Sequence, residues 1–141
     1  MKDITKKKET KRTAIARARI YINKEIYERV KNKEIPKGDL EEITKVVSFL
    51  GVKKTPFILP FCHNILVEGS DFNFKVNEKF IEIELKVTSV SKTGVEMDAL
   101  FGVSAGILNI YDMLKFLKKD MKIEIELIYK KGGKSGVYRK S

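Results

Sequence analysis

The longest apolar run of this 141-residue chain extends from Ala99 to Tyr111, between the two carboxylates Asp98 and Asp112. The run is too short to cross a bilayer, which takes roughly 20 apolar residues. It is apolar nearly all round a helix, so we expect it to be buried on more than one side. Gly102 and Gly106 would let another backbone approach closely. A buried helix over residues 95–118 therefore constrains the rest of the fold.

Strands are predicted on both sides of this helix. Alternation of apolar and polar residues predicts a first strand over 13–22 and a hairpin over 72–88 that turns at Asn77-Glu78. The final strand places two groups of residues on opposite faces. One face carries Ile123, Ile125, Leu127 and Tyr129, and the other carries Glu124, Glu126 and Lys130.

Two helices are predicted between the first strand and the hairpin. Asn23 caps a short helix, and Asp39 with Glu42 forms a capping-box-like start for a second helix that ends at Gly51. Prolines at 56 and 60 make the segment 55–64 irregular or extended, because proline is excluded from helix interiors and central strands.

The order of these elements is the split β-α-β pattern of ferredoxin-like folds with one extra helix. We therefore expect an α+β fold in which a four-stranded antiparallel sheet carries helices on one face. The other face must be polar or covered by a second subunit. The length fits a single domain over 1–141, with a basic N-terminal arm over 1–12 and a glycine-rich basic tail over 131–141.

The net charge of +10 is concentrated at the two ends of the chain. Residues 1–12 and 115–141 carry the whole excess, so the middle of the chain is neutral. Such ends either hold an anion between them or act as solubilising tails. A small phosphorylated ligand and nucleic acid are both candidate anions, but the aromatic residues form no recognisable base-stacking motif.

The tail reads Lys-Lys-Gly-Gly-Lys-Ser-Gly from Lys130 to Gly136. Gly133, Lys134 and Ser135 match the second half of a phosphate-binding loop, but Ile128 occupies the place of its first glycine. The tail is therefore interpreted either as a flexible arm that could wrap a phosphate or as a solvated terminus.

Asp112 and Lys115 lie three residues apart on one face of the long helix. They form either an ordinary surface ion pair or a pair in which the carboxylate holds the lysine charged for proton transfer. Asp98 and Asp112 are separated by about 21 Å along a straight helix. If both ends of the helix are functional, the site must combine one end with the opposite end from a neighbouring subunit.

The start of this helix carries Glu96 and Asp98. Thr93 and Glu96 have capping-box spacing, which is the structural interpretation of these acids. His63 is the only histidine and Cys62 the only cysteine, so they cannot complete a zinc site or an internal disulfide. No secretory signal is recognisable, and we expect a cytoplasmic protein without membrane contact.

Four motifs occur in register along nearly the whole chain. They are Cys62-His63, Lys-Thr-Gly-Val-Glu-Met over 92–97, Ile-Tyr-Asp-Met over 110–113 with Lys115, and the glycine-rich run over 130–136. Together they resemble the MoaC family of cyclic pyranopterin monophosphate synthases in molybdenum cofactor biosynthesis. Asp98 stands where the family usually has glutamate, and Asn64 replaces the proline that usually follows Cys-His.

The resemblance implies a lyase that rearranges 3′,8-cyclo-7,8-dihydroguanosine triphosphate to cyclic pyranopterin monophosphate and releases pyrophosphate. It also implies a homohexamer, a trimer of dimers, with active sites at subunit interfaces. No redox cofactor, resident metal or nucleic acid is expected, although Mg²⁺ could accompany the triphosphate. The alternatives are a basic nucleic-acid-binding module, which the net charge of +10 would favour, and an inactive family member that acts as a structural partner.

The resemblance also assigns roles to residues of this chain. Asp112 and Lys115 would form the acid–base pair, with Asp112 orienting and charging Lys115. The substrate-binding residues would be Phe61, Cys62, His63, Met97 and Asp98 in the pocket, Glu96 at the purine-derived part, and Arg12, Lys37 and Lys130 at the triphosphate.

Overall fold

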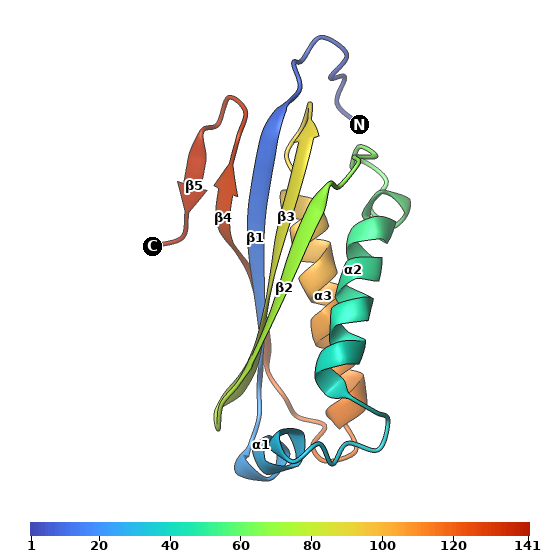
Figure 1. The fold of residues 1–141 in the computed structure, drawn as a ribbon, viewed down its shortest axis with the longest axis vertical. Coiled ribbons are helices and arrows are strands. Elements are labelled where there is room, and N and C mark those ends of the chain that lie inside the picture. Colours follow the sequence, from blue (N-terminus) through green and yellow to red (C-terminus); the bar gives the residue numbers. More distant parts are fainter.

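β1 (Thr10–Tyr21) lies at the centre of an antiparallel sheet in the computed structural model, which describes residues 1–141. The sheet has five strands in the order β2-β3-β1-β4-β5. The other strands are β2 (Gly69–Val76), β3 (Phe80–Ser91), β4 (Ile123–Lys131) and β5 (Val137–Arg139). The helices are α1 (Lys24–Lys31), α2 (Leu40–Ile58) and α3 (Glu96–Leu114). Figure 1 shows α2 and α3 side by side on one face of the sheet, with α1 at its lower end.

The prediction of an α+β fold with helices on one face is confirmed, and the four expected strands are present. The fifth strand, β5, was not predicted, because we expected the tail to be flexible. Residues 137–139 return along β4, where Arg139 pairs with Tyr129. Gly132, Gly133 and Gly136, in the turn between these strands, have positive φ, a conformation that glycine adopts at little steric cost.

The core lies between the sheet and α3. Ala14, Ala16, Ala18 and Ile20 of β1 alternate with more exposed residues and are fully buried. The corresponding positions of β3 are also buried: Ile81, Ile83, Leu85 and Val87. The three alanines of β1 are small, so α3 can lie close to the middle of the sheet. The buried side chains of α3 pack against the larger side chains of the neighbouring strand β3.

α2 does not end at Gly51, as the sequence analysis predicted, but continues to Ile58. Gly51 is a packing residue rather than a terminator, since a Cβ there would lie 3.0 Å from Ala105 Cβ and 3.1 Å from Gly102 Cα. Pro56 lies in the last turn of α2, where it lacks the N–H that would bond the carbonyl of Val52. The predicted irregular segment 55–64 is therefore irregular only after residue 58.

α3 is shorter than predicted, because it begins at Glu96 and ends at Leu114, with Lys115 as its C-cap. The capping-box interpretation of Thr93 is wrong, since the N-cap is Val95 and no side chain caps the helix. Burial on more than one side is confirmed, with the sheet on one side and α2 on another. The chain itself covers the helix here, so this burial alone does not require a second subunit. No helix has the length and hydropathy needed to cross a membrane.

A β-bulge in β4 changes the faces that we predicted for the last strand. Ile15 pairs with Tyr129 and Ala16 pairs with Leu127, so Ile128 is the extra residue. Beyond it, Lys130 pairs with the core-facing Ala14 and therefore lies on the helix side of the sheet. The assignment of Tyr129 to the face of Ile123 and of Lys130 to the opposite face is thus wrong.

Gly106→Ala should destabilise the fold, because the new Cβ would lie 2.2 Å from Ser48 Oγ and 2.8 Å from Ile83 Cδ1. We expect a loss of about 1–3 kcal/mol in the free energy of unfolding, measured by urea denaturation. Gly69→Ala is the matched control, because its Cβ would meet nothing closer than Thr88 Cβ at 3.9 Å. Equal stability of the two variants would contradict the packing described here.

Candidate functional site

The C-terminal end of α3 carries a carboxylate held between two lysines. Asp112 Oδ1 lies 2.9 Å from Lys115 Nζ, and Asp112 Oδ2 lies 3.0 Å from Lys37 Nζ. Lys37 comes from the turn before α2 and also donates to the backbone carbonyl of Asp112 at 3.3 Å. That bond satisfies a carbonyl in the last turn of α3 and places a positive charge at the negative end of the helix dipole. We call these three residues the lower cluster.

The lower cluster is a charged hydrogen-bonded triad at the surface. The bonds from Lys115 and Lys37 hold the pKa of Asp112 below its usual range. The bond to Asp112 raises the pKa of Lys115 above its usual range. Lys115 is therefore an ammonium group at neutral pH, oriented by its carboxylate and able to donate a proton.

The N-terminal end of α3 meets the tail at a second group of residues. The bulge in β4 brings Lys130 Nζ to 3.1 Å from Glu96 Oε1, and both side chains are partly buried. The buried Arg12 donates from Nε to the carbonyl of Ser91 at 3.3 Å. A Cβ at Gly133 would lie 2.0 Å from Arg12 Nη1, so the glycine turn packs directly on the guanidinium. We call this region the upper cluster.

Asp98 is the buried acid of the upper cluster. Burial raises its pKa to about 6, and the nearby Glu96 adds to this effect. Burial also raises the pKa of the Cys62 thiol, with further contributions from Asp98 and Glu96. These charge effects indicate that Cys62, in the loop after α2, lies near the carboxylates at the start of α3. A carboxyl that titrates near pH 6 can exchange a proton under physiological conditions.

The remaining predicted pocket residues lie around this end of the molecule. His63 Nε2 contacts the backbone carbonyl of Lys2 at 2.6 Å, which ties the N-terminal arm to the loop after α2. Phe61 and Met97 expose 76% and 41% of their surface, so neither is held in a closed pocket of the single chain. No group of three or more His, Cys, Asp and Glu side chains is placed to hold a metal ion.

The structure separates the predicted phosphate ligands. Arg12 and Lys130 lie in the upper cluster, whereas Lys37 lies in the lower cluster, at the opposite end of α3. The two ends are about 21 Å apart along the helix. One chain therefore cannot bring all three cations to a single triphosphate.

Two further cations of the upper cluster, Lys7 and Lys134, were not among the residues predicted to bind the triphosphate. Burial lowers the pKa of Lys7, and the positive charges of Arg12, Lys2, Lys134 and Lys130 lower it further. Lys7 and Lys134 thus belong to one concentration of positive charge built from both ends of the chain. The charge excess at both termini was the signal for this arrangement, but it did not show which lysines meet.

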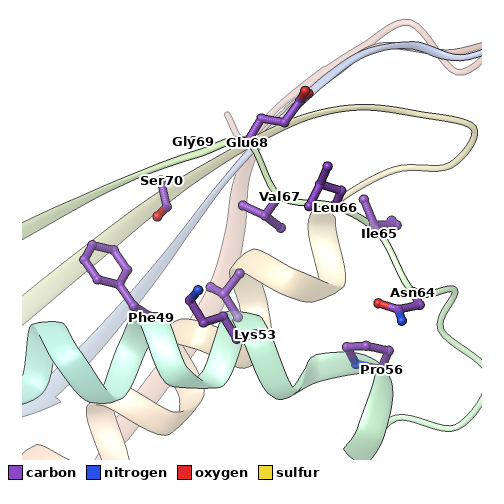
Figure 2. A pocket seen from close by; sticks show the side chains of 11 residues that line it. Phe49, Lys53, Pro56, Asn64, Ile65, Leu66, Val67, Glu68, Gly69 and Ser70 are labelled. Atoms are coloured by element: carbon purple, nitrogen blue, oxygen red, sulfur yellow. The ribbon is translucent and has the colours of Figure 1, made fainter.

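A separate cavity of about 420 Å³ lies between α2 and the segment 64–70. Figure 2 shows Phe49 and Lys53 rising from α2 toward this segment, with Asn64 at the end nearest the Cys62-His63 loop. No residue of either cluster lines the cavity. Of its lining residues, only Pro56 and Asn64 were noted from the sequence, and neither belongs to a cluster, so the cavity adjoins the upper cluster without containing its chemistry.

The fold and the two clusters define an α+β protein with a carboxylate–lysine pair at one end of a buried helix and a concentration of cations at the other. A sequence model of the MoaC family matches residues 1–133. Proteins named cyclic pyranopterin monophosphate synthase are similar along most of their lengths. Those of Peptoclostridium acidaminophilum and Clostridium acetobutylicum are 43% identical over 99% of this chain, covering 90% and 89% of their own lengths. That of Bacillus thuringiensis subsp. konkukian is 45% identical over 100% of this chain and 91% of its own. The chain belongs to the MoaC family.

Asp98→Asn should change stability in a pH-dependent way. The folded state holds the Asp98 proton more tightly than the unfolded chain, so the free energy of unfolding falls as pH rises from about 4 to about 6 and stays lower above it. We expect Asp98→Asn to be more stable than the natural chain by about 1–3 kcal/mol at pH 8, with a much smaller difference at pH 4.5.

Chemical denaturation at the two pH values measures this difference. The exposed Asp120→Asn is the control, because it removes the same charge without relieving burial. A stability difference for Asp98→Asn that does not depend on pH would contradict the buried, proton-binding carboxyl.

Proposed function

We propose that this chain is a cyclic pyranopterin monophosphate synthase of molybdenum cofactor biosynthesis, acting in the cytoplasm. It rearranges 3′,8-cyclo-7,8-dihydroguanosine triphosphate to cyclic pyranopterin monophosphate and releases pyrophosphate. The observation that carries the proposal is the pair Asp112–Lys115 within a chain of this family, fixed at 2.9 Å and held from the other side by Lys37.

Lys115 supplies the proton transfers of ring formation in this proposal. Asp112 keeps the amine protonated in the resting protein, so the first step open to Lys115 is to donate a proton. The neutral amine that results can then accept a proton from the substrate. Asp112 remains an anion throughout, since two lysines lower its pKa, and it orients the amine.

The cations act on the phosphate chain. A cyclic monophosphate arises from a triphosphate when a hydroxyl of the substrate attacks the α-phosphorus. The bond to the bridging oxygen then breaks, and pyrophosphate leaves with the electron pair. Arg12, Lys130 and Lys7 of the upper cluster, with Lys37, would neutralise the charge that grows on the leaving group. Mg²⁺ carried by the triphosphate is compatible with these roles, and we propose no resident cofactor.

A composite site in a homohexamer, a trimer of dimers, joins the two clusters. The separation of about 21 Å along α3 supports this arrangement, because a small substrate cannot span both ends of one helix. Apolar side chains on α2 and α3 that are more than half exposed also support contact with another copy. They are Val46, Leu50, Phe57, Ile58 and Leu108.

Lys115→Ala tests the chemical role. Purified protein is incubated with the cyclised guanosine triphosphate, and pterin and pyrophosphate are measured. We expect activity to fall by about 10²–10⁴-fold, because the group that moves protons is lost. The exposed Lys119→Ala is the control and should retain activity. Turnover by Lys115→Ala at the natural rate, or no turnover by the assembled natural protein, would overturn the proposal.

Mixing two inactive variants tests the composite site. Lys115→Ala disables the lower cluster, and Glu96→Ala disables the upper cluster. If each site takes its two halves from different chains, random co-assembly should restore about a quarter of the natural activity, because one site in four receives two intact halves. Sites contained within one chain would give no restored activity in the co-assembled mixture.

A further inference from the structure

The face of the sheet away from α2 and α3 carries a cationic groove of about 580 Å³. It is lined by Lys11, Thr13, Ile15, Lys86, Tyr129, Lys131 and Arg139, which include four cations and no acid. We call it the sheet-face groove. None of its residues was assigned to the substrate site.

Residues paired side by side on four neighbouring strands form a row that lines the groove. Ile15 pairs with Lys86 on β3 and with Tyr129 on β4, and Tyr129 pairs with Arg139 on β5. At about 4.8 Å between neighbouring strands, the backbones of Lys86 and Arg139 are about 14 Å apart. Ile15 therefore lies at the floor of the groove, between cations carried by strands on either side.

The cations of the groove are free of acidic partners. No carboxylate lies within 4.0 Å of the charged nitrogens of these four side chains, although Asp71 is opposite Lys86 on β2. The guanidinium of Arg139 lies 4.9 Å from the centre of the Tyr129 ring, which holds it over the groove. Four uncompensated positive charges around one hollow attract a multiply charged anion.

The sheet separates this groove from the upper cluster. Successive residues of a strand point to opposite faces, so Arg12 faces the helices while Lys11 faces the groove. The same holds for Lys130 and Lys131, because the bulge sets their alternation. The groove is therefore a site distinct from the one proposed for the substrate.

The next row of the sheet limits the length of the anion. Arg17, two residues beyond Ile15, pairs with Glu84 on one side and Glu126 on the other. Arg17 is itself neutralised by an ion pair with Glu126. A long phosphate backbone that followed the sheet would meet these carboxylates, whereas a short polyphosphate fits above them.

We propose that the sheet-face groove binds a short linear polyphosphate, either free or as the phosphate chain of a nucleotide. Its oxygens are bound by Arg139 and by the ammonium groups of Lys11, Lys86 and Lys131. The ligand lies on the floor formed by Thr13 and Ile15.

Methyl NMR with inorganic triphosphate tests this site on the assembled protein at low ionic strength. The δ1 methyl of Ile15 reports on the groove, and the methyl of Met97 reports separately on the upper cluster. We expect a saturable shift of the Ile15 signal that weakens as salt is added. Guanosine triphosphate serves as the second probe, and a similar Ile15 shift would extend the site to nucleotides.

Two triple variants with the same change in charge decide the assignment. Lys11→Ala/Lys86→Ala/Lys131→Ala should weaken binding at the Ile15 methyl by roughly tenfold or more, since three cations are lost. Lys24→Ala/Lys45→Ala/Lys79→Ala removes exposed lysines elsewhere and should change it by less than about twofold. Should the first triple variant fail to fold, Arg139→Ala replaces it, with a smaller loss expected.

The proposal is overturned if the Ile15 signal of the natural protein shows no saturable shift, or if the two triple variants bind triphosphate equally. A single-stranded DNA dodecamer gives the third arm. Tighter binding of the dodecamer than of triphosphate, with a steeper dependence on salt, would assign the face to nucleic acid instead.

Discussion

The close packing of α3 between the sheet and α2 is the constraint on which the rest of the structure depends. Gly102 and Gly106 have no side chains, so Leu85, Ile83 and Ser48 from the elements on either side come within contact distance of their backbone. A helix packed this closely on two sides has little freedom to tilt or slide. Both clusters are placed relative to this helix, so their separation is fixed by the core.

Polarity is divided between the two faces of the sheet by the same alternation that forms the core. Small apolar residues of β1 face the helices, while Arg17 and Arg19 lie on the open face with Glu82 between their charges. This open face is polar, which is one of the two outcomes that the sequence allowed. A charged ladder of this kind leaves the strands exposed to water without an apolar patch.

Sequence patterns predicted the elements that depend on local periodicity and missed those that depend on distant contacts. Asn23 and Asp39 cap their helices as expected, since each bond is made within three residues. Gly51 was wrongly predicted to end its helix. A glycine is needed there because α3, which is far along the chain, packs against it. The bulge at Ile128 coincides with a break in the alternation, because Leu127, Ile128 and Tyr129 are consecutive apolar residues, but the prediction continued the alternation through it. The motifs indicated both clusters, but their separation into two ends followed only from the length of the helix.

The extra residue in β4 gives two adjacent lysines different surroundings. Lys130 reaches Glu96 on the helix side, while Lys131 emerges on the open side of the sheet. Both belong to one hairpin closed by β5. Any shift of that hairpin would move both side chains together. The upper cluster on the helix side and the sheet-face groove on the open side are therefore mechanically coupled at this edge of the sheet.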